Sequence, residues 1–456
     1  MLPAELFKAY DIRGIVGRTL TADTVARIGQ ALGSLILERG GREVAIGRDG
    51  RLSGPELGAA LSAGLTAAGV DVVDLGLVAT PMTYFAAHHL GTGSAVMLTG
   101  SHNPPDYNGL KMVVQGETLA GEAIQALRRR IEAGDLARGA GHSRTHDIGP
   151  AYIERIASDI RLTRPMRVAV DCGNGVAGAY APALYRALGC QVDELYCAVD
   201  GHFPNHHPDP SVPANLSDLI AHLAAGEAEI GLAFDGDGDR LGVVTREGRI
   251  IYPDRQLMLF AADLLARNPG ARVLYDVKST RKLGPWIRDH GGEPELCRTG
   301  HSLVKARMRE SGALLAGEMS GHVFFKERWY GFDDGLYAGA RLLEILSREA
   351  DSTATLNALP DAVNTPELHI AMAEGEPHRL IAALTATARF EGADEVITLD
   401  GLRVEYPDGF GLMRPSNTTP VVVLRFEADD AAALARIQAD FRRELHAARP
   451  GLVLPF

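Results

Sequence analysis

One arrangement of segments recurs three times along the chain: an apolar strand ends in a polar loop, helices follow, and a second apolar strand ends in another polar loop. The six predicted strands are residues 44–46 and 95–98, 168–170 and 230–234, and 273–275 and 313–316. Strands that alternate with helices predict α/β units with mixed, largely parallel sheets. Ligands of such sheets bind beyond the carboxyl ends of the strands, so the six polar loops are the expected functional loops.

The clearest helix of the first unit is predicted after Ser53. Glu56 follows three residues later and completes a capping box, in which the serine and glutamate side chains each bond a backbone N–H of the first turn. Leu57, Leu61 and Leu65 then recur at helical spacing, which predicts the face that packs on the sheet.

From about residue 361 the pattern changes to short strands separated by turn residues, predicted at 396–399, 402–406 and 421–426. A helix is predicted over residues 430–446. Its apolar stripe comprises Leu434, Ile437, Phe441 and Leu445. This change of pattern predicts a smaller α+β domain. A chain of 456 residues is too long for a single hydrophobic core, so several domains are expected.

The composition limits the class of partner. A formal net charge of -12 argues against general nucleic-acid binding, which needs a basic surface. Residues 1–14 have no apolar signal-peptide core, and no stretch reaches the roughly 18 apolar residues of a membrane helix. We therefore expect a cytoplasmic protein that binds neither nucleic acid nor membrane, and in which any anionic ligand meets a local basic cluster.

Asp235, Asp237 and Asp239 alternate with glycines directly after a predicted strand. A gently curled backbone can direct all three carboxylates to one point, and three hard oxygen ligands suit magnesium or calcium. An EF-hand is excluded, because its sixth and twelfth positions would be Arg240 and Arg246, where that loop needs glycine and glutamate. A solvated turn rich in aspartate and glycine is the alternative.

Ser101 lies in the loop of residues 99–104, after another apolar strand. His102 follows it and is expected to be a local hydrogen-bonding partner. A serine in a loop more often caps or turns the chain than acts as a nucleophile, so the motif alone does not decide between these roles.

Residues 414–419 combine an arginine, three hydroxyl side chains and an asparagine, which suits a phosphate dianion as well as a capped turn. Further basic side chains lie at or near other strand ends, and together they would supply the positive field that the acidic chain otherwise lacks. These are Arg13, Lys111, Arg240, Lys278 and His301.

A rival motif occurs at residues 173–178, where GNGVAG matches the G-x-G-x-x-G pattern between a strand and a helix. Asp193 follows about 20 residues later, as in dinucleotide-binding folds. The alternative to this interpretation is a glycine-rich packing turn. An NAD-dependent dehydrogenase would leave Ser101, the aspartate triplet and the Arg414 loop without roles.

Taken together, five motifs resemble those of the α-D-phosphohexomutase superfamily, in the same order and across the whole chain. They are residues 9–14, 99–104, 235–240, 317–322 and 414–418. Within that superfamily the chain looks most like the bacterial phosphomannomutases/phosphoglucomutases of exopolysaccharide and lipopolysaccharide precursor synthesis. Met319 favours this hexose branch over the alternative, the phosphoglucosamine mutases, in which glutamine is expected at that position.

The resemblance implies a fold of four domains around a central cleft, three of related α/β topology and a fourth that closes over the bound sugar phosphate. The domains are expected at residues 1–147, 148–249, 250–361 and 362–456. The glycine-rich turn at Gly173 is scaffold in this family. We expect a monomer.

The resemblance also implies a mechanism. Phosphorylated Ser101 donates its phosphoryl group to O6 or O1 of mannose or glucose phosphate, which gives a hexose 1,6-bisphosphate. This intermediate turns end for end, and its other phosphate returns to Ser101. Mg²⁺ is expected on Ser101, Asp235, Asp237 and Asp239, with glucose 1,6-bisphosphate as activator. Lys111, Arg13 and His322 are the candidates for proton transfer.

The expected substrate-binding residues are Tyr10, Arg240, Lys278, His301, Glu318, Ser320, His322, Arg414, Ser416, Asn417 and Thr418. A metal-dependent phosphatase with Asp235 as nucleophile is a further alternative.

Overall fold

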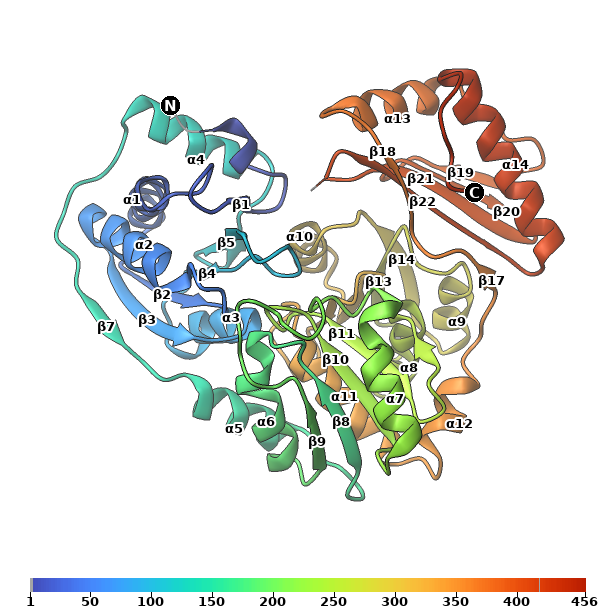
Figure 1. Cartoon of the computed structure of the whole chain (residues 1–456), viewed down its shortest axis with the longest axis horizontal. Coiled ribbons are helices and arrows are strands. Elements are labelled where there is room, and N and C mark those ends of the chain that lie inside the picture. Colours follow the sequence, from blue (N-terminus) through green and yellow to red (C-terminus); the bar gives the residue numbers. More distant parts are fainter. Residues whose placement is uncertain (1–2, 418) are drawn as a thin grey trace.

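The computed structural model describes residues 3–417 and 419–456, and the strands of this part of the chain form four sheets in sequence order (Figure 1). The first sheet has the order β1-β5-β4-β2-β3-β7, with β6 beside β5. Its strands are β1 (Ile12–Ile15), β2 (Glu43–Arg48), β3 (Asp71–Leu77), β4 (Ala95–Leu98), β5 (Tyr107–Val114), β6 (Glu117–Thr118) and β7 (Ser143–Thr145).

The second sheet has the order β12-β11-β10-β8-β9, and the third has the order β14-β13-β15-β16. The strands of the second are β8 (Arg167–Asp171), β9 (Gln191–Leu195), β10 (Ile230–Phe234), β11 (Leu241–Thr245) and β12 (Ile250–Ile251). The strands of the third are β13 (Arg272–Asp276), β14 (Glu293–Cys297), β15 (Leu315–Gly317) and β16 (Val323–Phe325).

These three sheets share one topology. In each, the first strand of the repeat (β2, β8 or β13) lies between two parallel neighbours, and a fourth strand runs antiparallel beside the second neighbour. The architectural repeat predicted from the sequence is therefore confirmed, with mixed sheets whose central strands are parallel. The loops after β4, β10 and β15, which carry Ser101, the aspartate triplet and Glu318, occupy equivalent places in the three units.

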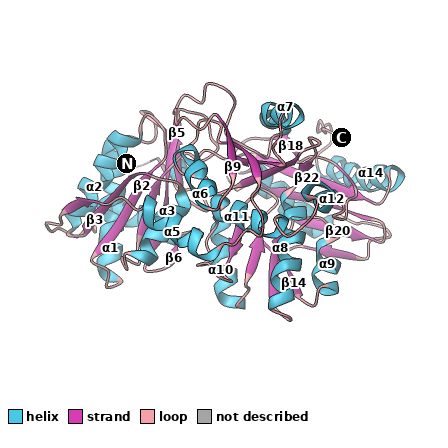
Figure 2. Cartoon of the chain, turned by 90° about the horizontal axis from the view of Figure 1, so that it is seen from below, coloured by secondary structure: helices cyan, strands magenta, loops and turns pink. Residues whose placement is uncertain are grey.

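Helices flank the strands of these units (Figure 2). In the first unit they are α1 (Ala22–Glu38), α2 (Gly54–Ala68), α3 (Thr80–His89) and α4 (Glu122–Ala133), after the 3-10 turn η1 (Ala4–Leu6). In the second they are α5 (Gly149–Asp159), η2 (Val176–Ala179), α6 (Ala181–Ala187), η3 (Pro213–Leu216) and α7 (Ser217–Ala225). In the third they are α8 (Pro253–Arg267), α9 (Leu283–Asp289), α10 (His301–Ser311), α11 (Gly335–Leu346) and α12 (Ser352–Asn357).

Helix α2 confirms the predicted helix, and Leu57, Leu61 and Leu65 are buried as expected. The predicted capping box is wrong. Ser53 has helical backbone angles and makes no capping bond to the first turn; its Oγ instead accepts a hydrogen bond from Asn108. A tertiary contact has thus replaced the local one.

The fourth unit is an antiparallel sheet with two helices, in agreement with the predicted α+β domain. Its strands are β17 (Val363–Asn364), β18 (Leu368–Ala371), β19 (Glu395–Ile397), β20 (Leu402–Tyr406), β21 (Gly409–Pro415) and β22 (Val421–Ala428), and its helices are α13 (Glu376–Thr387) and α14 (Ala431–Ala448). Asp430 caps α14, and Ile437, Phe441 and Leu445 bury its apolar stripe, while Leu434 is partly buried. Arg414 lies at the end of β21 and not in a loop as predicted, because it pairs with Val423 of β22.

The units differ in how they are joined. One continuous apolar core includes residues of the first three units, whereas the fourth unit has a core of its own. The fourth unit meets the third through buried arginines: Arg403 donates to the carbonyl oxygens of Val277 and Ser279, and Arg425 donates to that of Lys278. The junction also holds one small apolar cluster of Val277, Phe410 and Leu412. A largely polar junction of this kind suits relative domain motion better than a large shared apolar core does.

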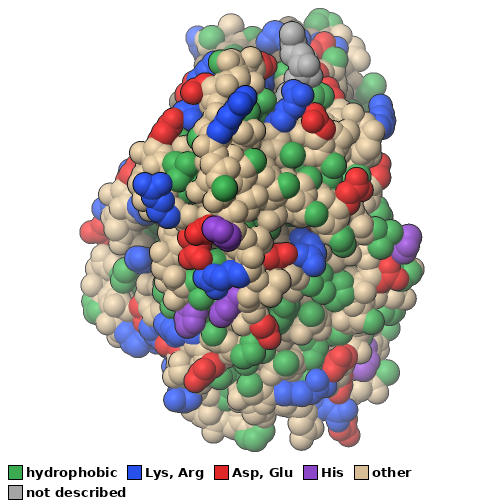
Figure 3. All heavy atoms as spheres, turned by 90° about the vertical axis from the view of Figure 1, so that its left-hand side faces the viewer, with side chains coloured by type: hydrophobic (Ala, Val, Ile, Leu, Met, Phe, Trp, Pro, Cys, Tyr) green, Lys and Arg blue, Asp and Glu red, His purple; other side chains and the backbone are tan. Residues whose placement is uncertain are grey.

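The surface carries charges of both signs. On the face seen in Figure 3, lysine and arginine side chains are interspersed with aspartate and glutamate rather than gathered in one basic patch. Within residues 3–417 and 419–456, the helices are all too short or too polar to cross a membrane.

Candidate active site

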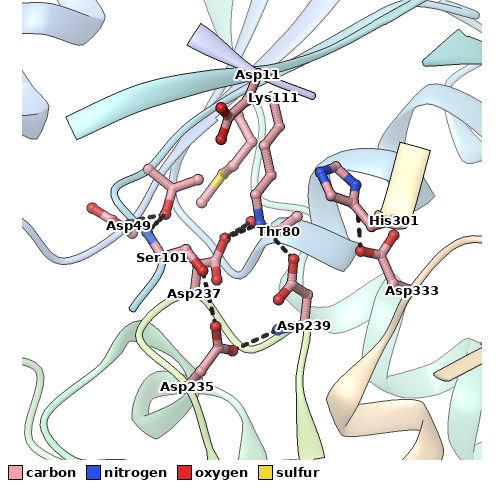
Figure 4. Close-up of polar contacts among 12 residues, drawn as sticks. Asp11, Asp49, Thr80, Ser101, Lys111, Asp235, Asp237, Asp239, His301 and Asp333 are labelled. Carbon is pink, nitrogen blue, oxygen red and sulfur yellow. Dashed lines mark hydrogen bonds and ion pairs between the residues drawn. The ribbon is translucent and has the colours of Figure 1, made fainter. Parts of the chain in front are cut away.

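Ser101 lies three residues beyond Leu98, the last residue of β4, and is almost fully buried. Its backbone has a φ of +50°, a left-handed conformation that non-glycine residues seldom adopt. Its Oγ donates a 3.0 Å hydrogen bond to Asp235 Oδ2 of the second unit (Figure 4). The same Oγ lies 3.1 Å from Nδ1 of His102. The expected local bond to His102 is confirmed, and the serine hydroxyl is directed at the aspartate triplet.

Asp49 and Arg51, in the segment that follows β2, hold the Ser101 loop in this conformation. The sequence alone did not single out either residue. Asp49 Oδ2 accepts hydrogen bonds from Thr99 Oγ1 (2.7 Å) and from the N–H of Gly100 (3.1 Å). The guanidinium of Arg51, whose side chain is fully buried, uses all five of its N–H groups. The acceptors are Asp49 Oδ2 and the carbonyl oxygens of Ser101, Asn103, Pro104 and Tyr107.

The triplet Asp235, Asp237 and Asp239 follows β10, and all three side chains are buried with oxygens within 4.8 Å of one another. Asp237 Oδ1 and Asp239 Oδ1 are buried without hydrogen-bond partners. A buried carboxylate oxygen without a partner is costly unless a cation meets it. The donor set therefore fits a hard divalent cation, as predicted, and the triplet can hold a metal ion.

Lys111 of β5 faces the same triplet. Its Nζ lies 2.7 Å from Asp237 Oδ2 and 2.5 Å from Asp239 Oδ2. Burial would lower the pKa of Lys111, but the two carboxylates outweigh it and raise that pKa well above its usual value. Thr80, at the start of α3, adds a 2.5 Å hydrogen bond to Asp237 Oδ2.

The pKa values of Asp235 and Asp237 shift in opposite directions. Burial raises the pKa of Asp235 well above its usual value, and the neighbouring charges of Asp237 and Asp239 add to that rise. Burial also acts on Asp237, but the ammonium of Lys111 and the hydrogen bonds from Lys111 and Thr80 lower its pKa overall. Asp237 thus stays ionised, while a further positive charge would favour the ionised form of Asp235.

A second buried cluster adjoins the triplet. His322 Nδ1 lies 3.6 Å from Asp239 Oδ1 and 3.1 Å from Asp333 Oδ2, and Asp333 also accepts a 2.9 Å hydrogen bond from Lys305. His301 lies 3.8 Å from Asp333, and burial, followed by the charge of Lys305, lowers its pKa well below the usual value. The sequence reasoning missed Asp333 and Lys305, whose positions carry no motif.

One cavity of about 600 Å³ joins the four units. It is lined by every predicted site residue that the structure describes, apart from the aspartate triplet behind Ser101. These lining residues are Tyr10, Arg13, Ser101, Lys111, Arg240, Lys278, His301, Glu318, Ser320, His322, Arg414, Ser416 and Asn417. The predicted Thr418 lies outside the described residues. Residues more than 400 positions apart thus converge, as the predicted central cleft requires.

Cationic side chains surround this cavity. Arg13 bonds Asp11 and Asn103, and Arg240 Nε donates to His322 Nε2 over 3.1 Å. Lys278 pairs with Glu367 of the fourth unit at 2.9 Å, and Arg414 Nε donates to Asp400 at 3.1 Å. Since both arginine and lysine keep further donors, the cavity can receive anionic groups at two separated places.

Glu318, after β15, is buried against the third unit. Its Oε1 accepts a 2.6 Å hydrogen bond from the N–H of Gly300, whereas Oε2 is buried without a partner. Asp276, at the end of β13, accepts from the N–H of Met319 and so holds this loop as Asp49 holds the Ser101 loop. A buried acceptor beside the cavity suits the hydroxyl groups of a sugar.

The glycine-rich turn at residues 173–178 is a packing turn. A Cβ at Gly178 would lie 2.1 Å from the carbonyl oxygen of Cys197, and one at Gly175 would lie 3.0 Å from Gly236 in the aspartate loop. Asp193, which a dinucleotide site would need, is paired with Arg167 and His222. The interpretation of this turn as scaffold is confirmed, and the dehydrogenase alternative loses its only motif.

Comparison with known proteins agrees with this geometry. Models of the phosphoglucomutase/phosphomannomutase α/β/α domains I, II and III match residues 4–138, 150–248 and 252–363, and that of the C-terminal domain matches residues 367–444. A phosphoglucomutase of Neisseria meningitidis is 60% identical over 99% of this chain and 98% of its own length. A phosphomannomutase/phosphoglucomutase of Pseudomonas aeruginosa is 59% identical over 100% of this chain and 98% of its own.

A crystal structure of a phosphoglucomutase/phosphomannomutase family protein from Burkholderia thailandensis superposes with a TM-score of 0.96, at 61% identity and over 100% of both chains. Fold, site and relatives together define a phosphohexose mutase, an isomerase that transfers a phosphoryl group. The chain belongs to the phosphoglucomutase/phosphomannomutase family.

Proposed function

We propose that Ser101 carries the phosphoryl group that this mutase transfers, and that it exchanges this group with O6 and O1 of mannose and glucose phosphates. The observation that carries the proposal is the 3.0 Å hydrogen bond from Ser101 Oγ to Asp235, in a triplet suited to a cation. In the first half-reaction the P–Oγ bond breaks and a bond forms between phosphorus and the sugar oxygen. The sugar hydroxyl loses its proton, and the product is a hexose 1,6-bisphosphate.

The second half-reaction is the reverse at the other end of the sugar. After the bisphosphate has turned within the cavity, its second phosphoryl group passes to Ser101 and the vacated sugar oxygen takes up a proton. No water is consumed, so the net reaction is an isomerisation. A phosphatase with Asp235 as nucleophile would instead release inorganic phosphate.

Mg²⁺ is the proposed ion of the triplet, held by Asp235, Asp237, Asp239 and the phosphorylated Ser101. When bound, the ion would neutralise the charge that spreads over the phosphoryl oxygens during transfer. Lys111 supplies a fixed positive charge at the same place, since its contacts with Asp237 and Asp239 keep it protonated.

For the proton of the sugar hydroxyl we propose His322 ahead of Lys111 and Arg13. Two carboxylates hold Lys111 in its charged form and an arginine does not deprotonate in proteins, so neither is a ready proton acceptor, whereas the imidazole of histidine has two ring nitrogens that can accept or donate a proton. His322 lines the cavity, and Asp333 lies 3.1 Å from its Nδ1.

Substrate binding is proposed to use the same residues in both orientations of the sugar. Arg414, Ser416 and Asn417, with Thr418 from the sequence motif, would hold the phosphate that is not reacting. Glu318 and Ser320 would accept and donate hydrogen bonds to sugar hydroxyls, and further contacts would come from Tyr10, Arg240, Lys278 and His301.

The remaining proposals concern the whole molecule. We propose domain boundaries at residues 147/148, 249/250 and 361/362, glucose 1,6-bisphosphate as the activator, and a cytoplasmic monomer. We also propose that the fourth domain closes over the substrate. A hydrogen bond from Asn417 of the fourth unit to Tyr10 of the first unit supports this closure.

Intact-mass measurement before and after addition of glucose 1,6-bisphosphate, with a coupled mutase assay, tests the proposal. The expected result is a gain of one phosphoryl group on Ser101 together with interconversion of the two monophosphates. Isomerisation by a protein whose Ser101 never carries phosphate would refute the phosphoserine mechanism, and steady release of inorganic phosphate would favour the phosphatase.

A further inference from the structure

A second cavity of about 480 Å³ lies between the first and third units. Its walls come from α3, β5 and β6 of the first unit and from α10 and residues 326–332 of the third. None of the residues that line it also lines the cavity beside Ser101. The substrate site therefore does not account for it.

The lining of this second cavity is aromatic on one side. The rings of Tyr330 and Phe332 are nearly parallel, at 4° with centroids 5.9 Å apart, and His88 stacks on Tyr330 with centroids 4.8 Å apart. Such a layer of rings offers a flat apolar ligand both contact area and a preferred orientation.

The charges of the lining have one sign. Lys305, Arg309 and Lys326 line the cavity, and the described lining includes no aspartate or glutamate. Burial and the charge of Lys326 lower the pKa of His88, in keeping with a positive surrounding. Lys326 is exposed, and Arg309 is exposed and keeps donors beyond its bond to the carbonyl oxygen of Gly116, so a carboxylate attached to an aromatic ring matches both halves of the lining.

One wall residue connects this cavity to the catalytic one. Lys305 Nζ donates a 2.9 Å hydrogen bond to Asp333 Oδ1 and lies 4.2 Å from the centroid of the Tyr84 ring. Asp333 in turn lies 3.1 Å from His322. An anion that draws Lys305 toward the second cavity would therefore weaken the contact that balances the charge of Asp333 beside His322.

We propose that the second cavity binds small aromatic carboxylates, and that their binding slows the mutase through Lys305 and Asp333. Binding at a place separate from the substrate predicts a lower kcat with an unchanged KM for the hexose phosphate. The ligand class follows from the aromatic layer and the three cations of the lining.

The test uses the full-length enzyme and 2-naphthoate, with neutral 2-naphthylmethanol as the matched probe. Calorimetry should detect naphthoate binding that is stronger than binding of the alcohol, and the mutase rate should fall with the same midpoint. Lys326→Met should weaken naphthoate binding about fivefold, the size expected for one exposed ion pair, and leave the rate without naphthoate unchanged.

A second variant keeps the test independent of charge. Ala87→Phe places a ring in the cavity from α3 and should abolish binding, with the melting temperature confirming that the protein is folded. Absence of naphthoate binding, equal binding of acid and alcohol, binding without a change in rate, or inhibition that competes with the hexose phosphate would each overturn the proposal.

Discussion

The guanidinium of Arg51 lies against the backbone of Ser101, whose carbonyl oxygen accepts a 2.8 Å hydrogen bond from Nη2. The same side chain also bonds the carbonyl oxygens of Asn103 and Pro104 in the loop and of Tyr107 at the start of β5. The left-handed conformation of Ser101 is thus maintained by an arginine 50 positions earlier in the chain, which makes Arg51 a positioning residue for the serine hydroxyl.

Replacement of Arg51 should therefore impair transfer at Ser101. Arg51→Lys keeps the charge but cannot bond all the acceptors, so kcat should fall about 100-fold, as expected when a reacting group is displaced by about 1 Å. Steady-state kinetics and circular dichroism measure this, with Arg48→Lys, a half-buried neighbour outside the loop, as control. An unchanged kcat in folded Arg51→Lys would contradict the positioning role.

Ser101→Ala removes the proposed phosphate carrier. It should take up no phosphate from glucose 1,6-bisphosphate and should show no mutase activity, because the hydroxyl of Ser101 both bonds the triplet and lines the cavity, whereas Thr80, which also bonds the triplet, is fully buried outside the cavity lining. Intact mass and the coupled assay measure both effects. Ser53→Ala in the same unit is the control, since Ser53 bonds Asn108 away from the cavity; stable phosphorylation of Ser101→Ala would exclude Ser101 as the carrier.

Much of this site could be predicted because its polar loops follow apolar strands. The predicted strands at 95–98 and 230–234 coincide with β4 and β10, whose ends carry Ser101 and Asp235. Apolar runs bounded by glycine and polar residues mark such strands clearly. The convergence of the loops then follows from parallel strands meeting at one edge of each sheet.

The supporting residues could not be predicted in the same way. Arg51 and Asp333 act through partners that lie far away in the sequence or on other elements, and nothing local distinguishes them from surface charges. Ser53 illustrates the converse error, since its sequence fits a capping box while the folded chain directs its hydroxyl to Asn108. Tertiary contacts decide both cases.

Removal of divalent cations should abolish the activity, and Mg²⁺ should restore it. Asp237→Asn should raise the Mg²⁺ concentration for half-maximal activity by about tenfold or more, because a charged ligand oxygen is lost. Asp218→Asn, an exposed change in the second unit, is the control. Full activity after exhaustive chelation would show that the triplet works without a metal.

Asp334 should make the stability depend on pH. Its buried carboxyl caps α11 and accepts hydrogen bonds from Tyr152, and burial raises its pKa from 3.8 to about 7. Between these two values the folded protein binds a proton that the unfolded chain does not. The free energy of unfolding should then fall as the pH rises from about 4 to about 7, by up to about 1.4 kcal/mol per pH unit.

The isosteric variant Asp334→Asn keeps an acceptor for the N–H of Tyr337 and cannot ionise. Urea unfolding of both proteins at pH 5 and pH 7.5 isolates the contribution of this group, because all other titrations are shared. The variant should gain stability relative to the native protein at the higher pH. Equal pH dependence of the two proteins would mean that Asp334 is ionised in the fold throughout.

Arg414→Ala should separate phosphate anchoring from phosphoryl transfer. Arg414 lines the cavity at the end of β21, far in sequence from Ser101, and Asp400 orients its guanidinium. Loss of its charge-assisted bonds should raise KM for both monophosphates at least about tenfold, since hydrogen bonds to charged groups contribute about 1.5–3 kcal/mol. Phosphorylation of Ser101 by glucose 1,6-bisphosphate should remain detectable by intact mass.

The control for this variant is Arg436→Ala, an exposed arginine of the same unit that pairs with Asp408. Its kinetics should match those of the unaltered enzyme. If Arg414→Ala had an unchanged KM for both substrates, β21 would not contribute to phosphate binding. A raised KM for only one of them would mean that the two orientations of the sugar use different anchors, because a single phosphate site must serve both ends of the molecule in turn.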